Sequence, residues 1–284
     1  MRTVAEQYHD HCVKLLINLR GENQPRGADL AAVCLLRSYE ILAEEVDPNR
    51  HLSGAYALVV DQPLGFQPPK LLVTGVFNYL REDITFSLMN RCSLKMSQDL
   101  DTLRSKLEFI EGHGQLNSIT LLLGRAINGM FCDNVDDDMR RQLESEIGTW
   151  EAHNRGILQP YSATDFQSTS GTFPSIWMLG DCYTAIAQYH LVCQSVLASS
   201  ASASIEVLEV LETNAAQLCG LAFTNGCAAV IVNSFGPMSF CGRHRRSSAL
   251  RSELVRRLIA CEKETGWPVR RIINDLEQHW SASV

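Results

Sequence analysis

The periodicity of apolar residues follows that of α-helices along nearly the whole chain, which restricts the fold more than any other feature. The clearest case is residues 71–91, where Val73, Phe77, Leu80, Ile84 and Leu88 recur at the spacing of one buried helix face. The other predicted helices cover residues 13–19, 30–41, 51–60, 114–132, 137–153, 174–199, 205–225, 248–265 and 268–280. Strand alternation appears nowhere. The sequence therefore predicts an all-α fold, with residues 1–284 forming a single domain of about nine to eleven packed helices.

Two connections stand out between the predicted helices. The segment Gly156–Pro174 is rich in Ser, Thr and Gly, and we expect it to be a long loop that serves as a lid or mobile connection. The low-complexity run ASSASAS at residues 198–204 is predicted to be a flexible join between two helices. No internal repeat is evident.

The ten cysteines are widely spaced, and no pair is closer than Cys219 and Cys227. A structural zinc site usually takes two ligands from one short turn, and no such pair is present. His9 and His11 would point in very different directions on a helix, so they are predicted to be exposed rather than metal ligands. We expect reduced cysteines that behave as small apolar residues, and neither a metal site nor a cofactor.

The charge of the chain is unevenly distributed. Residues 243–284 hold nine basic and five acidic side chains, although the whole chain has a formal charge of −7. The acidic body argues against general affinity for nucleic acids, because phosphate binding requires clustered basic residues. One weak candidate patch exists, formed by Arg243, Arg245, Arg246, Arg256 and Arg257. Its ordinary interpretation is a solvated loop and helix face.

The N-terminus has no apolar core of a signal peptide, and no uninterrupted apolar run is long enough to span a bilayer. We therefore expect an intracellular protein, nuclear or cytoplasmic, without a membrane partner. A homodimer is permitted by the composition but not required.

Several motifs follow one another in an order that is similar to a known family. They are LLRSYEIL at 35–42 followed by HLSGAYALV at 51–59, FNYLREDITFSLMNR at 77–91, FPSIWMLGDCYTAIAQYHL at 173–191 and CEKETGWPVRRIINDLEQHW at 261–280. Together they resemble the fungal-specific transcription factor domain, the helical regulatory region of fungal zinc-cluster regulators. The resemblance covers residues 7–280. It implies an all-α regulatory module.

The chain departs from that family at its N-terminal end. The resemblance implies a six-cysteine zinc cluster and several helices before the point at which this sequence begins, and neither is found here. We therefore expect an N-terminally truncated domain that lacks its own DNA reader, either as an excised piece or as a natural product of its gene.

Asp83 is the first candidate for chemistry. It lies on a second apolar face of the helix at 71–91, so this helix is expected to pack on two sides and to shield the carboxylate. The simpler interpretation is a salt bridge to Arg50, Arg91 or Arg125. The alternative is a general acid or base with a raised pKa.

His190 lies in the same way within an apolar stripe of the helix at 174–199, where a satisfied core histidine is the simpler interpretation. If Asp83, His190 and Tyr183 shared a cavity, they could move a proton in a cyclisation, isomerisation or elimination. Aromatic residues on the helix at 71–91 and near the long loop are candidates for lining a ligand pocket, and the equal alternative for those near the loop is that they cover the core. They are Tyr79, Phe86, Tyr161, Phe173 and Trp177.

Two functions remain open from the sequence. The first is a regulatory module that binds an effector or a partner protein. The second is a cofactor-independent lyase, isomerase or cyclase that acts on an apolar natural product of secondary metabolism. The absence of phosphate-loop, nucleophile-elbow and zincin motifs gives nucleotide, α/β-hydrolase and zincin chemistry no support.

Overall fold

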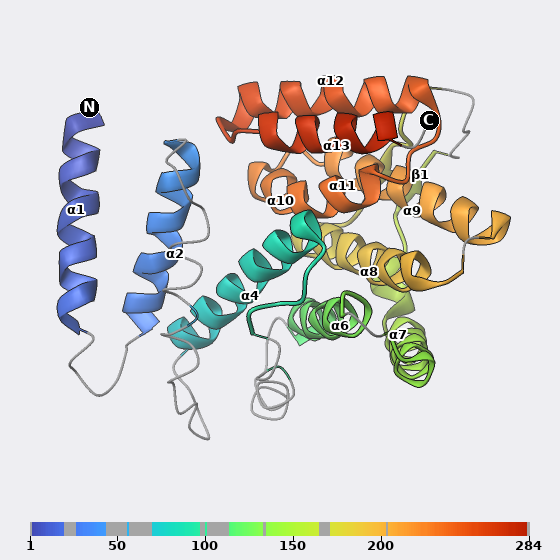
Figure 1. Ribbon diagram of the computed structural model, residues 1–284, viewed down its shortest axis with the longest axis horizontal. Helices are drawn as coiled ribbons and strands as arrows, with labels where there is room; N and C mark the ends of the chain where they lie inside the picture. The colour runs from blue at the N-terminus through green and yellow to red at the C-terminus, as the bar shows by residue number, and fades with distance from the viewer. Residues whose placement is uncertain are drawn as a thin grey trace.

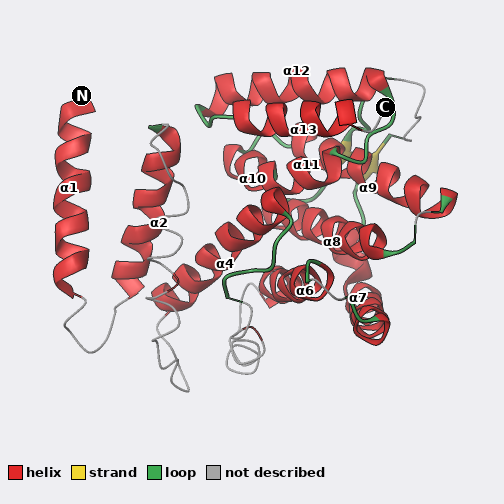
Figure 2. Ribbon diagram, in the orientation of Figure 1, coloured by secondary structure: helices red, strands yellow, loops and turns green. Residues whose placement is uncertain are grey.

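The computed structural model of the chain is helical almost throughout (Figure 2). The structure describes residues 2–19, 27–43, 56, 70–96, 100, 114–132, 135–164, 171–202 and 204–282. Eleven helices lie in this part of the chain. They are α1 (Arg2–Leu19), α2 (Gly27–Leu42), α4 (Lys70–Asn90), α6 (Gly114–Met130), α7 (Asp137–Leu158), α8 (Asp181–Ser200), α9 (Ile205–Thr224), α10 (Ala228–Asn233), α11 (Phe235–Gly242), α12 (Ser248–Thr265) and α13 (Arg270–Ala282). The predicted all-α fold is confirmed.

Helix α4 crosses the middle of the molecule, and α2, α6 and α11 pack against it (Figure 1). Its residues Leu80, Ile84 and Leu88 are fully buried in one continuous core. Behind it, α8 packs against α6, α7 and α9. Helix α1 lies at the edge of the molecule and contacts α2, where His9 Nε2 is 3.1 Å from a carboxylate oxygen of Glu40.

Helices α12 and α13 lie side by side at the C-terminal end (Figure 1). Gly266 ends α12 with φ of 71°, in the left-handed region that favours glycine. The following turn is fixed by a hydrogen bond of 3.2 Å from the Val269 amide to Glu262 Oε1. Trp280 near the end of α13 donates from its indole nitrogen to the carbonyl oxygen of Gly242, at 3.1 Å. The C-terminal pair is thereby joined to α11 of the core.

The connection before α8 differs from the predicted one. Helix α7 continues to Leu158, and a short antiparallel pair joins β1 (Ser162–Ala163) to β2 (Ile176–Trp177). The predicted loop over 156–174 is therefore partly helix and partly strand, and its residues 165–170 lie outside the described part. The predicted helix at 174–199 begins only at Asp181, because β2 occupies its first residues.

The predicted join at 198–204 is also shorter than expected. Helix α8 includes Ser200, and Ser204 already caps α9 by accepting a hydrogen bond of 3.2 Å from the Val207 amide. Residue 203 is outside the described residues. So is the predicted helix at 51–60, apart from Tyr56.

Gly220 on α9 allows the loop before α8 to approach the helix closely. A Cβ atom at this position would lie 2.5 Å from the carbonyl oxygen of Pro174. Gly220→Ala should therefore lower the free energy of unfolding by about 1–3 kcal/mol, as measured by urea denaturation. Gly148 on the exposed side of α7 is the matched control, because a Cβ atom there meets nothing within 4 Å. Gly148→Ala should stabilise by about 0.5–1 kcal/mol, and equal effects of the two substitutions would contradict the packing argument.

Candidate functional site

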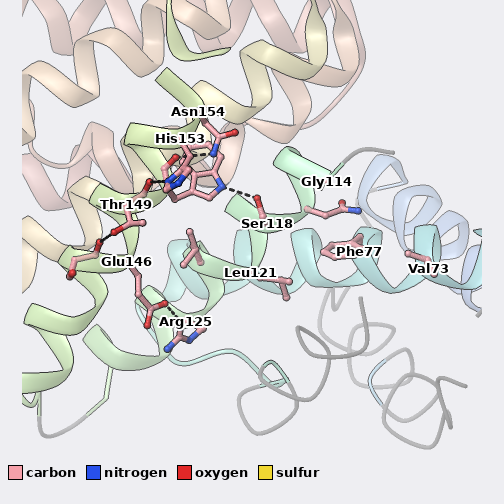
Figure 3. A pocket seen from close by; sticks show the side chains of 14 residues that line it. Val73, Phe77, Gly114, Ser118, Leu121, Arg125, Glu146, Thr149, His153 and Asn154 are labelled. Carbon is pink, nitrogen blue, oxygen red and sulfur yellow. Dashed lines mark hydrogen bonds and ion pairs between the residues drawn. The ribbon is translucent and has the colours of Figure 1, made fainter. Parts of the chain in front are cut away.

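A pocket of about 510 Å³ lies where α4, α6 and α7 meet. This volume falls in the range of sites for small organic molecules. Figure 3 shows polar side chains of α7 on one side of the pocket, with Phe77 and Val73 of α4 and Leu121 of α6 supplying apolar surface. The lining residues are Val73, Phe77, Gly114, Asn117, Ser118, Leu121, Leu122, Arg125, Ser145, Glu146, Thr149, Trp150, His153 and Asn154. A ligand would thus meet an apolar floor and a wall of hydrogen-bonding groups.

Trp150 is held in a fixed orientation at the pocket wall. Its indole nitrogen donates a hydrogen bond of 2.7 Å to the hydroxyl oxygen of Ser118 on α6 (Figure 3). The Ser118 hydroxyl in turn donates to the carbonyl oxygen of Gln115 at 3.0 Å. Asn154 donates through Nδ2 to the carbonyl oxygen of Trp150 at 2.8 Å. The indole therefore forms a rigid aromatic surface, which lowers the entropy cost of binding a flat apolar molecule.

The charged groups at the pocket neutralise each other. Arg125 of α6 and Glu146 of α7 form an ion pair across the two helices, with their side chains only 16% and 25% exposed. Glu146 also accepts a hydrogen bond of 3.0 Å from Gln142. Because the lining carries one arginine and one carboxylate in contact, it favours a neutral ligand over a strongly charged one.

His190 lies behind this wall. It is buried on α8, its Nε2 is 3.2 Å from a carboxylate oxygen of Glu151, and its ring stacks on Trp150 with centroids 6.0 Å apart. Burial lowers the pKa of the His190 imidazole, and the neighbouring Glu151 acts in the opposite direction. The sequence prediction of a buried histidine is confirmed. Its carboxylate partner on α7 was not foreseen.

Asp83 is completely buried, as the two-sided packing of α4 predicted. It accepts a hydrogen bond of 3.1 Å from the backbone amide of Met96, in the segment that follows α4. Burial raises the pKa of the Asp83 carboxyl, against the lowering effects of two backbone amides and of the charges of Lys95 and Arg37.

The predicted salt-bridge partners of Asp83 are placed differently. Arg125 pairs with Glu146, and Arg91 is an exposed residue at the end of α4. Arg50 is outside the described residues. Tyr183 is 40% exposed on the first turn of α8. Among the contacts of the described residues, none joins Asp83, His190 and Tyr183 to one another.

The predicted aromatic pocket residues do not gather at one place. Tyr79 is buried in the core, and Phe86 lines a different groove, between α4 and α13. Tyr161 and Trp177 are 63% and 46% exposed around the short strands. Phe173 packs on Phe223 with ring centroids 5.6 Å apart.

Sequence reasoning missed the residues that line the α4–α6–α7 pocket. Leu143, Ile147, Trp150 and Asn154 follow each other at helix-face spacing on α7, so one face of that helix was recognisable. Nothing in the pattern distinguished a face that packs on the core from one that opens into a pocket.

Most of the arginines in the weak basic patch contact carboxylates of the protein itself. Arg243 pairs with Asp275 at 2.7 Å and Arg246 with Glu212 at 3.0 Å. Arg245 is fully buried, with its guanidinium 6.0 Å from the centre of the Phe173 ring. Arg256 and Arg257 both pair with Glu253. The expectation that the chain does not bind nucleic acids directly stays a prediction, and this pairing agrees with it.

None of the ten cysteines is in a disulfide. Burial raises the pKa of the Cys219 and Cys241 thiols to about 12, so these side chains are uncharged apolar groups. In the described ranges, no group of three or more His, Cys, Asp or Glu side chains is placed to hold a metal ion. Nor does this part of the chain contain a helix with the length and apolar character needed to cross a membrane.

No family model, curated protein or solved structure matches the chain.

Proposed function

We propose that the protein is a regulatory module that binds a small, neutral and largely apolar effector in the α4–α6–α7 pocket. The observation that carries the proposal is the lining of this pocket: apolar residues on α4 and α6, a fixed indole at Trp150, and charges that pair with each other. The resemblance to the fungal-specific transcription factor domain supports a regulatory role, in which the bound effector alters how the helices contact a partner.

An enzyme has less support from the geometry. A lyase, isomerase or cyclase would need a proton donor that faces its substrate, but Asp83 is fully buried with a hydrogen bond to Met96, and His190 pairs with Glu151. The pocket wall offers amide, hydroxyl and indole groups, which bind and orient a ligand. It also carries the imidazole of His153, whose Nδ1 is 2.7 Å from the backbone carbonyl oxygen of Thr149.

A substitution that fills the pocket tests the proposal. Thr149 lines the pocket on the exposed side of α7, so Thr149→Trp can occupy the cavity without disturbing the core. With the neutral dye Nile red as the probe, the wild type should show a fluorescence increase on binding, and Thr149→Trp should raise the Kd at least about tenfold.

Thr74 provides the matched control. It is an exposed threonine on α4 whose hydroxyl donates to the carbonyl oxygen four residues earlier, at 2.9 Å, as that of Thr149 does at 2.8 Å. Thr74→Trp should bind Nile red like the wild type. Equal binding by all three proteins would contradict the assignment of the site.

The regulatory part of the proposal has its own test. For this test the protein is fused to a heterologous DNA-binding domain that controls a reporter gene. A fraction of a cell extract that displaces Nile red from the protein should then change transcription of the reporter. The Thr74→Trp fusion should respond in the same way, and the Thr149→Trp fusion should not. A response retained by Thr149→Trp would contradict regulation through this pocket.

A further inference from the structure

A second cavity is separate from the proposed effector site and differs from it in charge. It is a groove of about 670 Å³ bordered by α2, α4, α10 and the start of α13. Figure 1 shows the elements that border it: the upper part of α2, α4, α10 and the left end of α13. Its apolar surface includes Ile41, Phe86, Met89, Val232 and Trp267. The volume falls in the range of sites for small organic molecules.

A buried cation lies at one border of this groove. Arg37 of α2 lines the groove and is only 7% exposed, so its guanidinium is held largely out of water. Glu82 of α4 forms an ion pair with one of its terminal nitrogens. The Nε atom of Arg37 has no hydrogen-bond acceptor among the described residues. A buried cation whose hydrogen bonds are incomplete is costly, and an anion bound in the groove would stabilise its charge.

The start of α13 adds further positive potential. Arg270 and Arg271 are exposed at the groove, and the amides of the first helical turn have no acceptor within their own helix. The carboxylate of Asp275 at the groove is already paired with Arg243 at 2.7 Å. The groove therefore has an excess of positive charge on a chain whose formal charge is −7.

We propose that this groove binds an apolar carboxylic acid. The carboxylate lies at the border where Arg37 lines the groove, and the charge of the guanidinium attracts it. The arginines at the start of α13 attract the anion to the groove. The hydrocarbon part of the ligand lies along Phe86, Met89 and Trp267, which removes apolar surface of both molecules from water.

The probe for this site is decanoate, compared with decan-1-ol, which has the same chain without the charge. Isothermal titration calorimetry of the wild type should give a Kd for decanoate at least about tenfold below that for the alcohol. Arg37→Gln should remove this preference, and Arg271→Gln should weaken decanoate binding several-fold. Equal affinity of the wild type for the acid and the alcohol would overturn the proposal.

A second variant keeps the test valid if Arg37→Gln does not fold. Asn233 is an exposed residue of α10 that lines the groove, and Asn233→Trp should fill the groove and abolish decanoate binding. Thr149→Trp should leave decanoate binding unchanged, since it fills the other pocket. Decanoate binding that is lost in Thr149→Trp and retained in Asn233→Trp would overturn the assignment to the groove. The two sites can thus fail independently, because Nile red reports on one and the acid–alcohol difference on the other.

Discussion

Between pH 6.5 and pH 4, protonation at His244 is expected to lower the free energy of unfolding by up to about 3 kcal/mol. Burial, aided by neighbouring cationic groups, lowers the pKa of this imidazole to about 4. The cationic neighbours are Arg91, His279, Arg243 and Arg245. Its ring also packs edge-on against Phe240, with centroids 5.6 Å apart.

The direction follows from proton binding in the two states. Above pH 6.5 the imidazole of His244 is neutral in both the folded and the unfolded protein. As the pH falls below 6.5, the unfolded chain takes up a proton that the folded protein excludes until about pH 4. The unfolded state is therefore stabilised by up to about 1.4 kcal/mol for each pH unit in this window.

Urea denaturation at several pH values measures this effect. His244→Gln should reduce the loss of unfolding free energy between pH 6.5 and pH 4 by up to about 3 kcal/mol relative to the wild type. His11→Gln is the matched control, because His11 is exposed on α1 and should keep the wild-type pH dependence. A pH dependence that is the same in His244→Gln and the wild type would show that this imidazole is not held neutral by its surroundings.

The helices were predictable where one face is apolar and the other polar. The prediction for 248–265 agrees with α12 at Ser248–Thr265, and that for 71–91 agrees with α4 at Lys70–Asn90. Helices α10 and α11 were missed because the run from Ala228 to Gly242 is nearly all apolar and contains Gly236 and Pro237. From Ser234 to Gly242 every residue is buried, so this part of the segment has no polar face to reveal its period.

Contacts between distant segments were not predictable. The strands β1 and β2 are two residues each and exist because they pair with each other, so neither carries a periodic pattern of its own. The burial of Asp83 and His190, by contrast, was predictable from helix periodicity. Their partners, Met96 and Glu151, were not predictable, because they lie on other segments that fold back against α4 and α8.

The two cavities illustrate the same limit. A pocket forms where the side chains of several helices do not fill the space between them, so its position depends on the packing of those helices. The sequence placed Phe86 and Trp177 together as pocket residues because both are aromatic. In the structure, Phe86 lines the groove near α13, and Trp177 lies at the surface on β2. Residue type alone therefore indicates that a side chain suits a pocket, not which pocket it lines.

Leu80→Ala should be the most destabilising of the substitutions considered, because it empties space at the centre of α4. Leu80 is fully buried in the core, between helices that pack on α4 from both sides. Removing a buried leucine side chain loses its transfer free energy and leaves a cavity, at a cost of about 2–5 kcal/mol. Urea denaturation at pH 7 measures this cost as a lower transition midpoint.

Leu71 on the same helix is the matched control, since it is 52% exposed. Leu71→Ala should change the unfolding free energy by no more than about 0.5 kcal/mol, because little surface is removed from the core and alanine has the higher helix propensity. The difference between the two variants tests the two-sided packing of α4, on which both cavities depend. If Leu80→Ala were no more destabilising than Leu71→Ala, α4 would not be the central helix of the core. The walls that it supplies to the pocket and to the groove would then be in doubt as well.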